Sequence, residues 1–291
     1  LSASNFLNAA NFVNIGNQIA INLIIAVGMT IVITTGGIDL SVGANVALTG
    51  IIVASILKKL PPTLASALIG ILAGIAIGVL IGLINGALIT QLSLPPFIAT
   101  LGMMITIRGA ALIYSDGRVI YGLPDNFLDL FSGFYGTIPK PIVVAAVVCL
   151  LGIFILNKTI IGRYAIAIGG NERCVEVCGI NVNKYKMVVY AISGSLAAIS
   201  GLTLTSMMNA AEPIAGNLYE LDAIAVVVMG GTSLTGGKGS VVGTLLGALL
   251  LGIVRNGLNL MRVQPYYHQL ATGIIILFSV VINSIQSKSN S

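Results

Sequence analysis

The chain alternates between long apolar runs and short polar breaks. A helix needs roughly 20 apolar residues to cross about 30 Å of hydrocarbon. The pattern predicts spans at residues 18–35, 44–57, 64–92, 97–114, 141–156, 187–207, 241–254 and 266–285. A further apolar run at 218–229 is short, since it rises only roughly 20 Å as a helix. We therefore expect an all-α, polytopic integral membrane helix bundle of about nine spans with glycine-rich helix breaks, forming one domain over residues 1–291.

Composition supports a membrane location. Only 8% of the residues are charged and 56% are hydrophobic, with a mean hydropathy of +1.03, whereas soluble domains carry about 25% charged residues. Such a chain cannot cover itself with a water-facing surface. The formal net charge of +5 comes from basic residues scattered among loops. We interpret it as an orientation signal and not as a nucleic-acid-binding surface.

One sustained polar passage, residues 158–186, separates two predicted spans. Its charged residues are Lys158, Arg163, Glu172, Arg173, Glu176, Lys184 and Lys186. Loops rich in Lys and Arg are poorly translocated and mark the cytoplasmic face of a membrane protein. We expect this loop to be cytoplasmic and to be the place where a cytoplasmic partner binds. Its two consecutive glycines predict a turn, and Asn171 is then a good N-cap for a short helix.

The short run at 218–229 leaves two topologies open. If it crosses the membrane, the chain has nine spans with a cytoplasmic C-terminus and an external first residue; if it re-enters, the C-terminus is external. The charges do not decide between them: Lys238 and Lys288 are cytoplasmic in the first topology, Arg255 and Arg262 in the second. The first topology leaves residue 1 outside without a secretory signal, so we expect at least one span to precede Leu1.

Glycines occur in two informative arrangements. In the third predicted span they stand at every fourth residue, namely Gly70, Gly74, Gly78, Gly82 and Gly86. Such a glycine face predicts close packing against another helix. Two glycine-rich breaks, GGIDLSVG at 36–43 and GGTSLTGG at 230–237, share the pattern G-G-x-x-L-[ST]-x-G. Irregular backbone at membrane depth persists only beside a cavity or buried in protein, so the breaks indicate a transport path.

The sequence does not assemble residues for hydrolytic chemistry. Its single histidine, His268, stands beside two tyrosines near a span end, where an interfacial role is expected. Lys238 does not complete a Walker A motif, because Gly239 follows it in place of Ser or Thr. Cys174 and Cys178 have no histidine beside them and make a poor metal site. We expect no enzymatic activity, no cofactor and no metal.

Neutral hydrogen-bonding side chains dominate the polar positions within the spans, which suits a path for a neutral polyhydroxy solute better than one for an ion. Arg108 lies within about 10 Å of a span end, so it can snorkel to the interface. Asp39 can cap the helix that begins near Leu40. The candidate path residues are Asn22, Asp39, Ser41, Asn45, Asn85, Ser233 and Thr235. Each has the alternative role of cross-linking helices.

Three separated motifs carry a resemblance to a known family. They are GMTIVITTGGIDLSVG at 28–43, RYAIAIGGNERCVEVCGINVNK at 163–184 and YELDAIAVVVMGGTSLTGGKGSVVGTLLGALLLG at 219–252. In these stretches the chain resembles the permease subunits of bacterial ABC importers for simple sugars, with the ribose and galactose permeases as the nearest examples. The resemblance covers essentially the whole chain in order. It departs at Cys174 and Cys178, where small apolar residues are more usual.

The resemblance implies that the chain is a permease domain that moves a monosaccharide from a periplasmic sugar-binding protein to the cytoplasm. It implies ten spans in the full-length protein, a multi-pass location in the bacterial inner membrane in contact with lipid, and the crossing topology for 218–231. Its implied partners are a second permease subunit (as a homodimer) and a cytoplasmic ATPase with two fused nucleotide-binding domains. It further implies that residues 158–186 couple the permease to the ATPase. The residues concerned are Arg163, Gly169, Gly170, Asn171, Glu172 and Gly179.

Other functions stay open at this point. One is an ion-coupled secondary carrier or channel for a small neutral solute. This function would be favoured if uptake stopped when the proton gradient was collapsed at constant ATP. Another is a structural membrane scaffold. A third is an ABC permease for a different small solute, such as a branched amino acid or a signalling sugar. The sequence does not name the sugar, because specificity in such importers is expected to lie largely with the binding protein.

Overall fold

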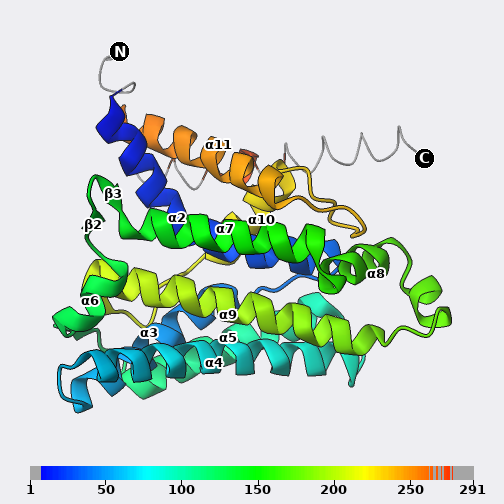
Figure 1. The fold of residues 1–291 in the computed structure, drawn as a ribbon, viewed down its shortest axis with the longest axis horizontal. Coiled ribbons are helices and arrows are strands. Elements are labelled where there is room, and N and C mark those ends of the chain that lie inside the picture. Colours follow the sequence, from blue (N-terminus) through cyan, green and yellow to red (C-terminus); the bar gives the residue numbers. More distant parts are fainter. Residues whose placement is uncertain are drawn as a thin grey trace.

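The computed structural model describes residues 8–261, 263–264, 267, 270, 272–275 and 277. Within them the chain is mostly helical (Figure 1). The helices are α2 (Ala9–Thr34), α3 (Val42–Lys59), α4 (Leu64–Thr90), α5 (Pro96–Ser115), α6 (Asp125–Phe131), α7 (Lys140–Lys158), α8 (Ile160–Val177), α9 (Val182–Met208), α10 (Tyr219–Met229) and α11 (Val241–Leu260). Four two-residue strands are β1 (Ile120–Tyr121), β2 (Phe134–Tyr135), β3 (Ile138–Pro139) and β4 (Ala210–Ala211). The predicted helical class is confirmed.

Seven of the described helices are long and apolar enough to cross a membrane, namely α2, α3, α4, α5, α7, α9 and α11. They match the first seven of the eight full-length spans predicted from the sequence. The expected total of nine needs two more segments. One is α10, which has only 11 residues. The other, 266–285, lies largely outside the described residues, as do His268 and Lys288.

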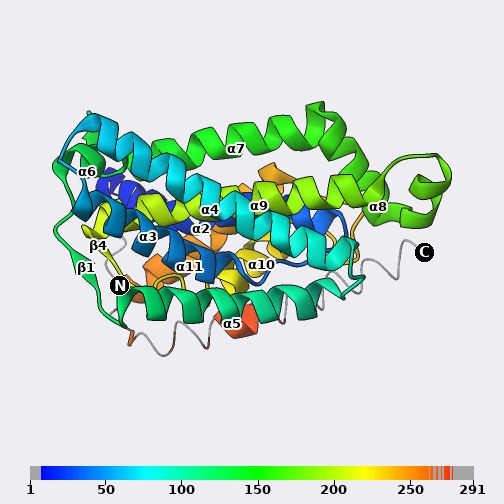
Figure 2. The same cartoon turned by 90° about the horizontal axis from the view of Figure 1, so that it is seen from below.

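Helix α9 is the centre of the bundle. It packs against α4, α2 and α3, and Figure 2 shows α7 and α5 at opposite edges with α9 between them. Its side chains Tyr190 and Leu202 are fully buried. Small residues fill most of its other buried positions, including Ser193, Gly194, Ala197, Ala198 and Gly201. Small side chains allow neighbouring helices to approach α9 closely.

The glycine face of α4 packs against other helices, as predicted. Its first two glycines face α3, and the last three face α9. A Cβ atom at Gly82 would collide with the carbonyl oxygen of Tyr190, and one at Gly78 would collide with that of Gly194. The backbones of α4 and α9 therefore touch at these positions, and at Gly78 and Gly194 neither helix carries a side chain.

Large apolar side chains cover the outward faces of the bundle. Leu72 in α4, Ile113 in α5 and Leu150 in α7 are 67%, 83% and 67% exposed, respectively. Contiguous apolar surface of this kind marks contact with lipid or with other protein. Large apolar side chains on the outside, over a core that is itself mostly apolar, are the pattern of a membrane bundle.

The two ends of the bundle differ (Figure 1). One end carries α8 with the basic passage 158–186, and we call it the basic end. The opposite end carries α6 and two small antiparallel strand pairs, β1 with β4 and β2 with β3. Phe127 of α6 is fully buried there. We call this opposite end the far end.

The chain crosses the whole bundle between Asn209 and Gly237, although α10 covers only part of the distance. At the far end, the N–H of Gly122 donates to the Asn209 carbonyl (3.3 Å), and at the basic end the N–H of Gly237 donates to the Thr34 carbonyl (2.9 Å). This course from the far end to the basic end is the one that the crossing topology for 218–231 requires. It places Lys238 at the basic end.

Helix α3 begins inside the bundle and not at its surface. The side chain of Asn45 donates to the carbonyl of Gly194, near the middle of α9 (3.1 Å). Residues 35–41 therefore run from the end of α2 back between the helices. We call residues 35–41 the first connection and residues 230–240, between α10 and α11, the second connection.

Replacing Gly78 by Leu should sharply reduce the yield of folded, monodisperse protein in detergent. The new side chain would force α4 and α9 apart, and overpacking of this kind costs about 1–3 kcal/mol or more. Ala76→Leu is the matched control, because Ala76 is on the exposed side of the same helix. Equal yields of the two variants would show that the face does not hold the helices together.

Candidate functional site

Three distant parts of the sequence come into backbone contact at the basic end. Besides the hydrogen bond from Gly237 to Thr34, Gly169 of α8 lies against the end of α2 and against the second connection. A Cβ atom at Gly169 would collide with the Thr34 carbonyl and the Gly237 nitrogen. Gly236, with φ +85°, faces the backbones of Gly36 and Gly169. We call Gly36, Gly169, Gly236 and Gly237 the glycine junction.

A cavity of about 360 Å³ opens beside the glycine junction. Its size is within the range of roughly 300–1,000 Å³ found for small-molecule sites. Its walls come from both connections, from α8 and α9, and from the ends of α4 and α5. The polar groups on these walls belong to Thr35, Asn171, Glu172, Lys186, Tyr190 and Thr235.

Helix α8 bends at Asn171, which has non-helical angles of φ −160° and ψ 96°. The side chain of Asn171 accepts a hydrogen bond from the N–H of Cys174 (3.0 Å). This confirms Asn171 as the N-cap of a short second helix, residues 172–177, which we call the short helix. The expected turn at the two preceding glycines is wrong, because Gly169 and Gly170 are helical and the chain turns at Asn171 itself.

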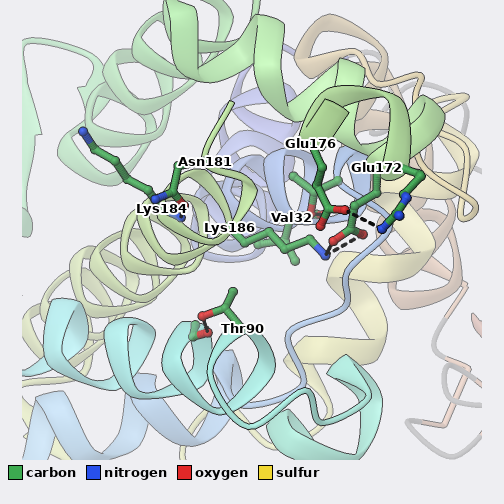
Figure 3. Close-up of polar contacts among 10 residues, drawn as sticks. Val32, Thr90, Glu172, Glu176, Asn181, Lys184 and Lys186 are labelled. Atoms are coloured by element: carbon green, nitrogen blue, oxygen red, sulfur yellow. Dashed lines mark hydrogen bonds and ion pairs between the residues drawn. The ribbon is translucent and has the colours of Figure 1, made fainter. Parts of the chain in front are cut away.

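Lys186 ties the short helix to α9 (Figure 3). Its Nζ lies 2.7 Å from both carboxylate oxygens of Glu172, and its side chain is only 17% exposed. The second ion pair of the short helix joins Arg173 to Glu176 at 3.5 Å and lies in the open. Exposed pairs of that kind contribute little to stability. Glu172 is therefore the charged residue that fixes where the short helix lies.

The remaining predicted coupling residues have different surroundings. Gly179, with φ +79°, ends the short helix, and the N–H of Ile180 donates back to the Val175 carbonyl (3.3 Å). This is the Schellman arrangement, which favours glycine. Arg163 is exposed on α8. Gly170 is also exposed, and a Cβ atom there would meet nothing within 4 Å.

Four of the predicted path residues lie together inside the bundle, in what we call the buried network. Asp39 accepts hydrogen bonds from Ser41, Asn85 and, on its other oxygen, Ser193 (2.7, 3.3 and 2.9 Å). Asn45 lies one turn further along α3. The four predicted residues, Asp39, Ser41, Asn45 and Asn85, are at most 1% exposed.

The expected capping role of Asp39 is confirmed in part. Helix α3 begins at Val42 and its N-cap residue is Ser41, which makes no capping bond through its side chain; the carboxylate of Asp39 accepts from the N–H of Ser41 (3.1 Å) just before the helix. Asp39 also joins the first connection to α4 and α9, through side chains that a sequence pattern cannot pair. The carbonyl of the preceding residue, Ile38, accepts a hydrogen bond from Tyr190 (3.3 Å). The first connection is thus anchored at two consecutive residues.

The other predicted path residues lie apart from the buried network. Ser233 and Thr235 share a hydrogen bond (2.8 Å) within the second connection, and Thr235 lines the cavity. Asn22 is in α2 and donates to Asp222 of α10 (3.4 Å).

Comparison with known proteins identifies the family. The family model described as "Branched-chain amino acid transport system / permease component" matches residues 11–280. The chain is 48% identical over 257 residues to the ribose import permease protein RbsC of Bacillus subtilis (strain 168), covering 87% of this chain and 78% of that protein. It is 44% identical over 261 residues to RbsC of Escherichia coli (strain K12), covering 88% and 79%.

The chain belongs to this permease family. The D-allose transport system permease protein AlsC of Escherichia coli (strain K12) is 37% identical over 257 residues, covering 88% of this chain and 78% of that protein. No solved structure matches the chain significantly. Together with the seven apolar helices, membership makes the permease a multi-pass protein of the inner membrane.

The permease also contains an ion pair that the sequence analysis missed. Arg255 of α11 makes two hydrogen bonds to Asp222 of α10 (2.9 and 2.6 Å), the acidic residue that also accepts from Asn22. Treating Arg255 as a loop charge that reports topology was therefore wrong. An arginine inside an apolar run needs an acidic or polar partner at the same depth in the membrane. This rule, applied to Arg255, indicates a buried ion pair.

Gly169→Val should destabilise the purified permease, because its side chain has to displace the backbone of Thr34 at the end of α2 and of the second connection. Overpacking at a buried contact costs about 1–3 kcal/mol, which should lower the midpoint of thermal unfolding in detergent by several degrees. Gly170→Val is the matched control, since that position has open space and changes mainly helix propensity, by less than about 1 kcal/mol. If the two variants unfold at the same temperature, the glycine junction is not a packed contact.

Proposed function

We propose that this permease imports a monosaccharide, with ribose as the first candidate, as the membrane subunit of an ATP-driven ABC importer. The observation that carries the proposal is its 48% and 44% identity to two ribose import permeases over most of its length. Two further relatives are named for the transport of D-allose and L-arabinose, at 37% and 35% identity, so other simple sugars are the next candidates. The proposal treats residues 1–291 as one permease domain.

The proposed assembly has the partners that ABC importers need. A cytoplasmic ATPase supplies energy, because the chain carries no Walker A motif, and a periplasmic binding protein delivers the sugar. We propose that the permease acts as a homodimer and that the ATPase has two fused nucleotide-binding domains. In this arrangement the basic end faces the cytoplasm, in agreement with the positive-inside rule.

We propose that the short helix receives the force of the ATPase and passes it on through two contacts. The first is the ion pair from Glu172 to Lys186, which leads into α9. The second is Gly169, which leads into the end of α2 and the second connection. Force passes between elements only through packed contact, and these two contacts join α8 to α9, to α2 and to the second connection. Arg163, Gly170, Asn171 and Gly179 shape and present the same region.

We propose that the cavity is the cytoplasmic end of the solute path. Ser233 and Thr235 are then the residues of the second connection that meet the sugar. The buried network (Asp39, Ser41, Asn45 and Asn85) is closed in the present conformation, so it contacts solute only when the first connection moves. Asn22 joins the path further toward the far end. Neutral hydroxyl and amide groups at these positions suit a polyhydroxy solute.

Uptake into vesicles tests the proposed function. The permease is reconstituted with its ATPase and binding protein, and import of labelled ribose, L-arabinose, D-allose and leucine is measured with and without ATP. We expect ATP-dependent import of a sugar that continues when an ionophore collapses the proton gradient. Import of leucine in place of every sugar would reassign the substrate class, and uptake that needs the gradient but not ATP would overturn the importer mechanism.

Glu172→Ala should weaken coupling without unfolding the bundle. Without Glu172, the short helix loses its anchor to Lys186, and we expect stimulation of the ATPase by loaded binding protein to fall about fivefold to tenfold, as for loss of one charge-assisted hydrogen bond. Glu176→Ala is the matched control, since its exposed pair with Arg173 should contribute little. The measurement is ATP hydrolysis in reconstituted vesicles. Full stimulation in Glu172→Ala would show that force enters elsewhere.

A further inference from the structure

The chain passes through the bundle between β4 and α10 as a series of turns at residues 213–218. We call this stretch the unwound segment. Gly216 in this segment, with φ +68°, is in backbone contact with Gly43 in the first turn of α3. Helix α3 begins inside the bundle, so the part of the unwound segment that contacts its first turn lies inside the bundle as well. Carbonyl groups at that depth need hydrogen-bond partners from the protein.

Arg108 of α5 provides such partners. Its Nη1 atom donates to the carbonyls of Pro213 (3.0 Å) and Ala215 (2.7 Å). The side chain is half-buried. The snorkelling expected for Arg108 from its distance to the span end is therefore wrong: the side chain turns to the unwound segment.

Helix α10 connects this contact to the glycine junction. Its first turn is held to α11 by the ion pair between Asp222 and Arg255. Its last turn leads into the second connection, where Gly237 bonds to Thr34. A helix of 11 residues is a stiff element, so a shift of the unwound segment changes the position of the second connection as well.

We infer that Arg108 is a positioning residue that sets the place of α10 and, through it, of the second connection beside the cavity. Arg108 joins α5, at one edge of the bundle, to the unwound segment. The unwound segment continues through α10 into the second connection, which contacts Gly169. The role of Arg108 in transport rests on the proposed function. Its effect on the position of the second connection is measured without any solute.

The test uses thiol accessibility in a chain whose three cysteines are replaced by alanine. A reporter cysteine is placed at Ile214, which is 57% exposed in the unwound segment, or at Thr235 in the second connection. The reaction rate with a small water-soluble maleimide is measured on purified permease in lipid nanodiscs. Each reporter is combined with Arg108→Ala, Arg108→Lys or Thr106→Ala. Thr106 is the control, since its hydroxyl bonds only to the Gly102 carbonyl in its own helix.

We expect Arg108→Ala to change the reaction rate at both reporters severalfold, because the two charge-assisted hydrogen bonds that hold these exposed positions in place are lost. Arg108→Lys, which keeps the charge and a donor, should give a smaller change, and Thr106→Ala none. An unchanged rate at the Thr235 reporter in Arg108→Ala overturns the inference, even if the Ile214 reporter reacts faster.

If Arg108→Ala does not fold, Arg108→Lys decides the question alone, and an unchanged rate at the Thr235 reporter again overturns the inference. A wild-type permease that imports no sugar would refute the proposed function and leave the labelling result unaffected. The two failures are therefore distinguishable.

Discussion

Helices inside a bilayer associate mainly through close packing, because lipid chains are as apolar as their side chains. In this permease the closest contacts are made where backbone meets backbone. Gly78 and Gly82 of α4 lie against the carbonyls of α9, and Gly169 lies against the end of α2 and the second connection at the basic end. The same kind of contact thus builds the core of the bundle and joins α8 to it. A side chain at any of these positions would separate elements that have to stay together.

Close packing creates a second requirement at the connections, where the backbone leaves the helix inside the bundle. Their carbonyl groups need donors, and side chains from neighbouring helices supply them. Tyr190 and Thr100 donate to the carbonyl of Ile38 in the first connection, and Arg108 serves the unwound segment in the same way. Asp39 is the counterpart of these donors, since it accepts from the helices on either side. Polar residues in the spans therefore have two roles: they stabilise irregular backbone, and some of them are candidates for contact with the solute.

Helix α9 is the element on which these interactions converge. Its first turns carry Lys186, which holds the short helix, and its middle carries Ser193 and Gly194, which hold the first connection and α3. The glycine face of α4 lies along the same part of α9. A displacement of the short helix therefore acts on the helix that also fixes the first connection. In the proposed function, this arrangement is the route from the ATPase to the part of the permease that opens.

The sequence alone determined the membrane class, seven spans, the basic loop, the glycine face of α4 and the N-cap at Asn171. Each of these is a local property, set by hydropathy, by helical period or by capping chemistry within a few residues. Tertiary structure decided the rest. It made Gly169, and not Gly170, the position at which a side chain would collide with neighbouring backbone, and it gave Glu172, Arg255 and Arg108 their partners. These outcomes depend on which distant backbones and charges meet when helices pack. No spacing along the chain encodes that, since one apolar face can pack against several neighbours and only the assembled bundle selects among them.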